Sequence, residues 1–241
     1  MLSVAAGEER VTQLLAESGI SLEIAVINAP DQIVLSGATV DIERALGLFV
    51  SHDIYVTRLK VIHGFHSRLM EPILDAFRQA FATVEFHSMT VRMIPSGGEQ
   101  GVRLDQADYW INQLRQPVYF SAAVSALAAA GANTFIEAGP MPVLSRLGVR
   151  THSEGTWIAT MRKAGEERRQ WLEAAGALFA AGVEVRLDTH DAKAPSVTLP
   201  LYVFDHSRYW FSRNPAADVR ARGRQSGAQM RSLAGRRVDI A

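Results

Sequence analysis

The sequence has no cysteine, and this absence excludes several kinds of chemistry at once. Disulfide frameworks, zinc sites built from thiolates and thiol nucleophiles all require cysteine side chains. The chain also has no apolar run near the roughly 18 residues that a membrane span needs. Met1 is not followed by the basic and then apolar stretches of an export signal. We therefore expect a cytoplasmic protein with no membrane partner.

An excess of charge of one sign is also missing, because 25 lysines and arginines balance 25 aspartates and glutamates. This balance gives no reason to expect nucleic acid as a partner. The sequence does have 241 residues, of which 48% are hydrophobic and 21% are charged. That composition predicts a soluble globular chain, with one large domain or one domain plus an appendage, that folds without a metal or a disulfide.

The first 62 residues alternate short apolar runs with amphipathic stretches. Strands are expected at residues 1–6, 22–28, 32–35 and 55–62, and helices at residues 8–17 and 41–50. The resulting order, β-α-β-β-α-β, is that of a ferredoxin-like subdomain. We place this small subdomain at residues 1–62.

Longer helices and isolated strands follow over residues 63–187, which is the pattern of an α/β fold with helices packed on a sheet. Helices are predicted at 67–82, 107–114, 120–130 and 166–181, and strands at 90–94, 134–138 and 157–161. Residues 188–214 are interpreted as a linker. Residues 215–241 are Arg-rich and nearly free of large apolar side chains, which predicts a disordered tail.

The densest polar group is His63-Gly64-Phe65-His66-Ser67-Arg68, where a predicted strand ends and a predicted helix begins. Catalytic groups favour strand ends, because a rigid element aims them while the loop leaves them accessible. One of the two histidines is therefore a candidate general base. The alternative is structural: Ser67 caps the helix and the histidines satisfy backbone groups. No third ligand for zinc lies nearby, so we expect no metal.

Two turn-like segments could belong to a site or could be structural. The segment 28–32, Asn28-Ala29-Pro30-Asp31-Gln32, fits a hairpin turn in which Asn28 bonds its own backbone. The segment 137–140, Glu137-Ala138-Gly139-Pro140, joins a strand to a helix, and Gly139 could supply a positive φ angle there. Taken alone, both segments favour the structural interpretation.

Taken in order, these segments resemble the acyltransferase domain of type I polyketide synthases and, more distantly, the malonyl-CoA:acyl carrier protein transacylase of fatty acid synthesis. The resemblance runs from Met1 to about Arg150. It rests on AVINAPDQIVLSG at 25–37, HGFHS at 63–67, MEP at 70–72, YW at 109–110, QLRQPV at 113–118 and EAGPMPVL at 137–144. LPLYVF at 199–204 and RYW at 208–210 resemble the linker that follows this domain in modular synthases.

The resemblance implies acyl transfer through a Ser-His pair, with no bound cofactor. The serine takes a malonyl group from malonyl-CoA as an ester and passes it to the phosphopantetheine thiol of an acyl carrier protein. His66 matches the general base of the family. A backbone carbonyl orients the imidazole in the family, and the matching residue here is Gln113. Asn28 falls in a matched segment and is carried over as a substrate-binding residue.

Three further substrate-binding residues, His63, Gly64 and Phe65, occupy positions that correlate with extender choice in the family. Malonyl-selective domains carry His-Ala-Phe-His, and methylmalonyl-selective domains carry Tyr-Ala-Ser-His. Phe65 would fill the space that a branching methyl group needs, so the resemblance implies malonyl selectivity, limited to about 1 to 3 kcal/mol per methyl group. Gly64 in place of alanine departs from the family pattern.

The nucleophile of the family stands in Gly-His-Ser-x-Gly, but no Gly-x-Ser-x-Gly occurs in these 241 residues. The resemblance implies that the serine, the arginine for the malonyl carboxylate and the oxyanion-hole donor belong to an N-terminal part of the domain. The expected fold is then the small subdomain beside the C-terminal part of an α/β-hydrolase-like core, inactive alone. The alternative is a non-catalytic fragment that docks acyl carrier protein or neighbouring synthase domains.

Overall fold

The computed structural model describes residues 1–97, 103–186 and 201–202. Contacts divide the chain into one compact unit at residues 1–187 and a second at 188–241. Apart from Leu201 and Tyr202, the predicted linker (188–214) and tail (215–241) therefore lie outside the described residues. None of the helices in the described ranges is long and apolar enough to cross a membrane.

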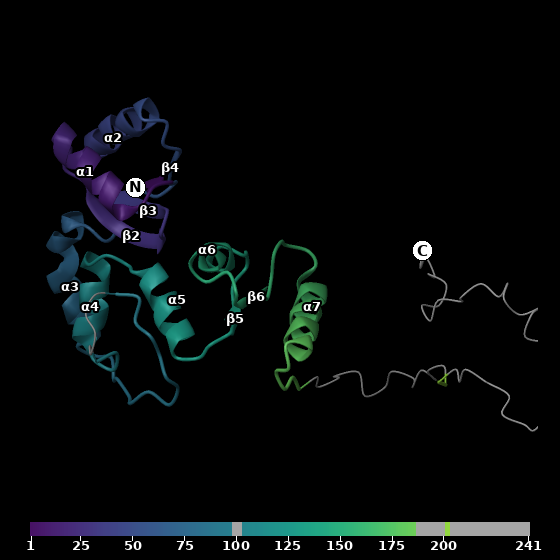
Figure 1. The fold of residues 1–241 in the computed structure, drawn as a ribbon. Coiled ribbons are helices and arrows are strands. Elements are labelled where there is room, and N and C mark those ends of the chain that lie inside the picture. The colour runs from purple at the N-terminus through teal and green to yellow at the C-terminus, as the bar shows by residue number, and fades with distance from the viewer. Residues whose placement is uncertain (98–102, 187–200, 203–241) are drawn as a thin grey trace, which may run out of the picture. The chain divides into compact units, whose positions relative to one another are not determined.

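The first unit begins with the predicted order of strands and helices (Figure 1). These elements are β1 (Leu2–Val4), α1 (Glu8–Ser18), β2 (Glu23–Ala29), β3 (Gln32–Ser36), α2 (Thr39–Ser51) and β4 (Val56–Arg58). The strands form an antiparallel sheet in the order β2-β3-β1-β4. β4 is shorter than the strand expected at 55–62.

One face of this sheet and the helices α1 and α2 enclose a hydrophobic core. Alternate side chains of β1 and β3 point into it, because successive residues of a strand face opposite sides. The helices add one apolar stripe each, as their spacing predicted. The fully or almost fully buried members include Leu2, Val4, Val11, Leu14, Ile33, Leu35, Ile42 and Phe49. Gly19, with φ 63°, ends α1 as expected.

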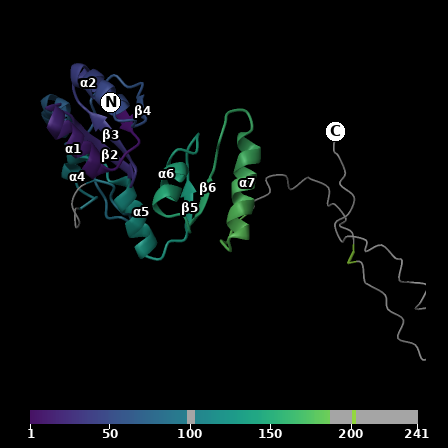
Figure 2. The same ribbon diagram turned by 45° about the horizontal axis from the view of Figure 1, so that its top comes forward.

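The rest of the unit is also α/β. It contains the 3₁₀ helix η1 (Arg68–Ile73), α3 (Leu74–Phe81), α4 (Ala107–Arg115), α5 (Phe120–Ala129), β5 (Thr134–Glu137), α6 (Leu144–Thr151), β6 (Thr156–Ala159) and α7 (Glu167–Ala180). β5 and β6 pair in parallel, with Thr134 opposite Thr156. These two strands lie between α6 and α7 in both views (Figures 1 and 2).

Two further predicted elements differ from the structure. The single helix expected at 67–82 is divided into η1 and α3, because Pro72 has no backbone N–H to donate within the first turns. The strand expected at 90–94 is absent: its residues are irregular, and Val91 is 77% exposed. An apolar run becomes a strand only when a neighbouring strand pairs with it, and among the described residues none does here.

The segment that follows α4 closes the outer edge of the four-stranded sheet. Val118 donates its N–H to the carbonyl of Ala25 (2.9 Å) and accepts from the N–H of Ile27 (2.8 Å). This single residue thus pairs in parallel with β2, which is one of the two edge strands. The exit of α4 is thereby fixed to the first sheet.

Candidate active site

The site is built on the loop 63–67 between β4 and η1, which closes tightly over the end of β3. A Cβ atom on Gly64 would lie 2.7 Å from Cδ1 of Leu69 and 3.3 Å from the hydroxyls of Ser36 and Ser67. Ser67 is fully buried; its hydroxyl donates to the carbonyl of Gly64 (2.6 Å) and accepts from the N–H of Leu69 (3.3 Å). The predicted helix cap by Ser67 is therefore confirmed.

His66 has an unusual backbone conformation within this loop. Its φ angle is +56°, in the left-handed region that residues other than glycine seldom adopt. Such a conformation costs about 1 kcal/mol or more and persists only where the surroundings impose it. Here the N–H of His66 donates to the carbonyl of Leu114 at the end of α4 (3.1 Å).

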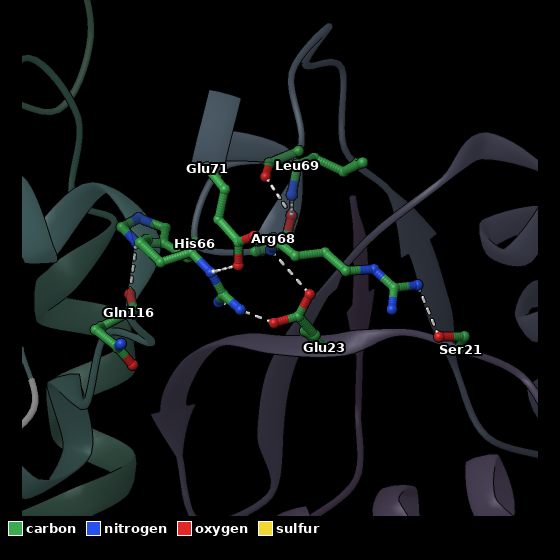
Figure 3. Close-up of polar contacts among 10 residues, drawn as sticks. Ser21, Glu23, His66, Arg68, Leu69, Glu71 and Gln116 are labelled. Carbon is green, nitrogen blue, oxygen red and sulfur yellow. Dashed lines mark hydrogen bonds and ion pairs between the residues drawn. The ribbon is translucent and has the colours of Figure 1, made fainter. Parts of the chain in front are cut away.

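The imidazole of His66 is held in one tautomer by a second backbone group. Its Nδ1 lies 2.9 Å from the carbonyl oxygen of Gln116 (Figure 3). A carbonyl oxygen can only accept, so in the neutral ring Nδ1 carries the proton and donates it, and Nε2 keeps a free lone pair. Nε2 of this half-buried ring is therefore the nitrogen that can accept a proton.

The carbonyl that binds this ring corrects the expectation of Gln113. Gln113 lies within the last turn of α4, where carbonyls point along the helix axis. Gln116 follows the helix with φ −83° and ψ 155°, because a residue before proline avoids helical geometry, and its carbonyl turns away from the axis. The side chain of Gln113 packs against Gly97, and its buried Oε1 has no hydrogen-bond partner among the described residues.

An ion-pair network that the sequence did not reveal surrounds the segment 114–116. Arg115 binds Oε1 of Glu71 through Nε and Oε2 of Glu23 through Nη1, both at 2.9 Å. Oε1 of Glu23 accepts from the backbone N–H of Arg68 (2.9 Å), and the Arg68 guanidinium donates to the hydroxyl of Ser21 (2.8 Å; Figure 3). The one feature of the sequence that could have pointed to this network is the position of Arg115 and Glu71 inside segments 113–118 and 70–72, which carry the family resemblance.

Partial burial opposes the charge of Arg115, but its bonds to Glu71 and Glu23 outweigh that effect and raise the pKa of the guanidinium. Arg115 therefore stays charged. The network joins β2, η1 and α4 through one side chain.

The expected substrate-binding residues do not all gather at this loop. The rings of His63 and Phe65 meet edge to face, with centroids 5.6 Å apart, and Phe65 is 37% exposed. His63 and Gly64 also line a hollow of about 200 Å³ beside Met1 and the start of α2. Asn28 is half-buried in β2, and no hydrogen bond in the described part of the chain joins its side chain to the loop.

In the segment 137–140, Glu137 has a structural role. The carboxylate of Glu137, at the end of β5, accepts the N–H groups of Val143, Leu144 and Ser145 and the hydroxyl of Ser145, at 2.7 to 3.0 Å. It thereby caps the N-terminus of α6. Gly139, which could have supplied a positive φ angle, does not have one.

The hairpin turn expected at 28–32 is present between β2 and β3. Arg150, in the last turn of α6, binds the side chains of Asp31 and Gln32 at this turn. The turn is thus fastened to α6 by its polar side chains.

A protein-family model described as "Acyl transferase domain" matches residues 1–185. Two polyketide synthases of Streptomyces halstedii, GfsA and GfsB, are 32% and 36% identical over 251 and 238 residues. The matches cover 100% and 95% of this chain but 3% and 4% of the synthases.

Solved structures agree with this match. The acyltransferase domain from the second module of the salinomycin polyketide synthase is 32% identical, with a TM-score of 0.72. That match covers 82% of this chain and 48% of the salinomycin chain. The malonyl-CoA:acyl carrier protein transacylase of Clostridium perfringens, at 19% identity and a TM-score of 0.64, shares the fold over 75% of this chain and 58% of its own. This chain belongs to the acyl transferase domain family, and its relatives are polyketide synthases.

Proposed function

We propose that this chain is the C-terminal part of a polyketide synthase acyltransferase domain, which loads a malonyl-type extender from acyl-CoA onto acyl carrier protein. His66 acts as the general base for a serine that another part of the domain supplies. The observation that carries this proposal is the arrangement of His66: its Nδ1 donates to a backbone carbonyl, which leaves Nε2 free to take a proton. The strained backbone at φ 56° places that ring on a rigid loop.

In this mechanism Nε2 of His66 removes the proton of the serine hydroxyl as the oxygen attacks the thioester carbonyl of malonyl-CoA. When the tetrahedral intermediate collapses, the proton passes to the departing thiolate of coenzyme A. The same steps in reverse move the malonyl group from the serine to the phosphopantetheine thiol. The carbonyl of Gln116 accepts the hydrogen bond from Nδ1–H throughout. It thereby stabilises the imidazolium that forms between the two proton transfers.

Exposed apolar side chains support the proposal that a further part of the domain covers this one. The buried cluster of the unit lies among the elements from β1 to β4. In contrast, Ile136 on β5 is 52% exposed, and Trp171 and Phe179 on α7 are 61% and 72% exposed. In the described residues β5 pairs with β6 alone, so each strand has an unpaired edge. We propose that the first six elements are the ferredoxin-like subdomain and that β5 and β6 belong to a larger hydrolase-like core.

The contact between His63 and Phe65 supports malonyl selectivity. Their edge-to-face packing holds the Phe65 ring against His63, in the loop that also carries His66. A benzyl group in that place would leave less room for the extra methyl of a methylmalonyl group than a serine would.

The test joins this chain to the N-terminal part of a related acyltransferase domain and measures malonyl transfer from malonyl-CoA to acyl carrier protein. His66→Ala should lower the rate by about 10²- to 10⁴-fold, the usual contribution of a general base. His52→Ala is the matched control, because the ring of His52 also bonds a backbone carbonyl, that of Leu48 (2.9 Å), at the end of α2. Its rate should equal that of the parent.

A His66→Ala rate within a few-fold of the parent would remove His66 from the mechanism. Binding of acyl carrier protein by the joined domain, with no transfer by either the parent or the variant, would instead favour a docking fragment.

A further inference from the structure

Arg115 stands between the two residues whose carbonyls hold His66. The carbonyl of Leu114 accepts the backbone N–H of His66 (3.1 Å), and the carbonyl of Gln116 accepts Nδ1–H (2.9 Å). The direction of both carbonyls therefore depends on the conformation of one short segment, 114–116. That segment lies where α4 ends, and helix ends readily fray.

We propose that Arg115 is a positioning residue for His66, which with Glu23 and Glu71 fixes the segment 114–116 and so determines which ring nitrogen of His66 is free of a proton. This inference rests on the proposed role of His66 as the general base. Arg115 touches neither substrate nor the reacting atoms in this scheme and acts through the backbone on either side of it.

The geometry of the guanidinium supports this role. Nε and Nη1 bind carboxylates from two different elements, Glu71 on η1 and Glu23 on β2, each at 2.9 Å. A planar fork with several donors can hold two carboxylates at fixed angles, which a lysine ammonium cannot. The side chain of Arg115 is 24% exposed, whereas those of Arg78 and Arg103, which pair with carboxylates close in sequence, are 55% and 67% exposed. Solvent therefore screens the pairs of Arg115 less.

Glu23 joins the C-terminal end of the loop 63–67, which carries His66, to the same ion-pair network. One of its oxygens binds Arg115, and the other accepts the backbone N–H of Arg68 (2.9 Å), which follows the loop 63–67. A single carboxylate on β2 thus restrains both the loop that carries His66 and the segment that holds its ring (Figure 3). Loss of Arg115 should loosen the segment 114–116, although Val118 still joins the chain after it to β2, and should leave the loop attached to β2.

The test uses the chain as it is and reads the ring directly. ¹⁵N NMR of the imidazole reports the tautomer, hydrogen exchange reports the backbone N–H of His66, and His66→Gln assigns both signals. In Arg115→Gln we expect a mixture of the two ring tautomers and amide exchange about tenfold faster than in the parent, because the acceptors open more often. The tautomer mixture and the exchange rate of Arg115→Lys should lie between those of the parent and of Arg115→Gln. Lysine keeps the positive charge but cannot bind both carboxylates with a planar guanidinium.

Arg150→Gln is the matched control, because Arg150 also binds two polar side chains distant in sequence, those of Asp31 and Gln32. It should leave the His66 tautomer and exchange rate unchanged. If Arg115→Gln does not fold, Glu71→Gln removes one of the two ion pairs of Arg115, at a carboxylate that is 57% exposed. It should shift the tautomer mixture and the exchange rate in the same direction by a smaller amount.

Unchanged tautomer and exchange in a folded Arg115→Gln chain would overturn the inference, as would equal shifts in Arg150→Gln. These readouts need no transfer activity. An inactive joined domain would therefore count against the proposed function and not against the role of Arg115.

Discussion

His66 shows how a single residue can be both strained and well held. Its left-handed backbone is unfavourable by itself, yet histidine tolerates this region better than most residues do. Two backbone carbonyls then compensate, one for the N–H and one for the ring. If the imidazole were present without these two carbonyl acceptors, neither of its tautomers would be favoured.

A prediction at this scale concerns the neighbours of His66. In the joined domain, His63→Tyr together with Phe65→Ser should raise methylmalonyl loading relative to malonyl loading by about tenfold, because the change opens space for one methyl group. A competition assay with both coenzyme A esters measures the ratio.

His63→Tyr alone is the control for this pair. It keeps the bulky Phe65 ring and should change the ratio little. If the double substitution does not change the ratio of methylmalonyl to malonyl loading, other residues determine the shape of the extender pocket.

The sequence could single out His66 as a candidate but not the carbonyl that binds its ring. A histidine between a strand and a helix is visible as a pattern, and so is the capping serine that follows it. The direction of a carbonyl depends on ψ, and here the choice between Gln113 and Gln116 is made by Pro117, which turns the backbone out of α4. The partners of Arg115 were hidden for another reason: Glu23 and Glu71 meet it only when β2, η1 and α4 come together.

Among the elements, α6 depends on a carboxylate that belongs to another element. Helices normally take their N-terminal cap from a residue that directly precedes them. Here Val143, which precedes Leu144, offers no side-chain acceptor, and Glu137 from β5 bonds the exposed N–H groups instead. The cap therefore also fixes α6 to the end of the strand.

We predict that Glu137→Gln destabilises the chain by about 1 kcal/mol at pH 7, as the loss of a helix cap does, because an amide has only one acceptor oxygen for these donors. Partial burial favours the neutral acid, but the donors from Ser145, Leu144 and Val143 outweigh it and lower the pKa of Glu137. A pKa lowered in the folded state gives stability that is complete above the unfolded value, about 4.3, and is lost as the pH falls through the folded value.

The difference between the parent and Glu137→Gln should therefore shrink from pH 7 to pH 3 in urea unfolding. Glu154→Gln, at an exposed carboxylate between α6 and β6, is the control and should match the parent at both pH values. A Glu137→Gln chain as stable as the parent at pH 7 would mean that the cap is dispensable.

Most elements could be predicted because their hydrophobic periods are local properties of the sequence. The failures have physical causes that are not local. The run at 90–94 has strand-like residues but no partner strand in the described part of the chain. The helix expected after Pro140 had no predicted bounds, because its start at Leu144 is set by Glu137 across the intervening loop.

For the molecule as a whole, burial is uneven. The elements from β1 to β4 enclose the main buried cluster, whereas Ile136 on β5 and Trp171 and Phe179 on α7 are large apolar side chains in contact with solvent. Exposed apolar area of this kind marks a surface that another segment or partner covers.

We predict that the chain alone forms no malonyl-enzyme. Acyl transfer to a serine needs a hydroxyl within reach of its base and donors aimed at the oxyanion. Ser67, the serine next to His66, is fully buried, and its hydroxyl already bonds the carbonyl of Gly64 and the N–H of Leu69. Intact mass after incubation with malonyl-CoA should show no added malonyl group. A stoichiometric adduct that disappears in Ser67→Ala would contradict both this prediction and the proposed source of the nucleophile.

The bond between His66 and Gln116 spans 50 residues, and this span sets an order of events on the ribosome. At about 5 to 20 residues per second, the strands and helices from β1 to β4 leave the exit tunnel before Gln116, which follows His66 by roughly 2.5 to 10 s. During that interval the sheet can fold while its edge strand still lacks Val118 and the ring still lacks its acceptor. A nascent chain arrested before Gln116 would therefore carry an imidazole that is free to exchange tautomers.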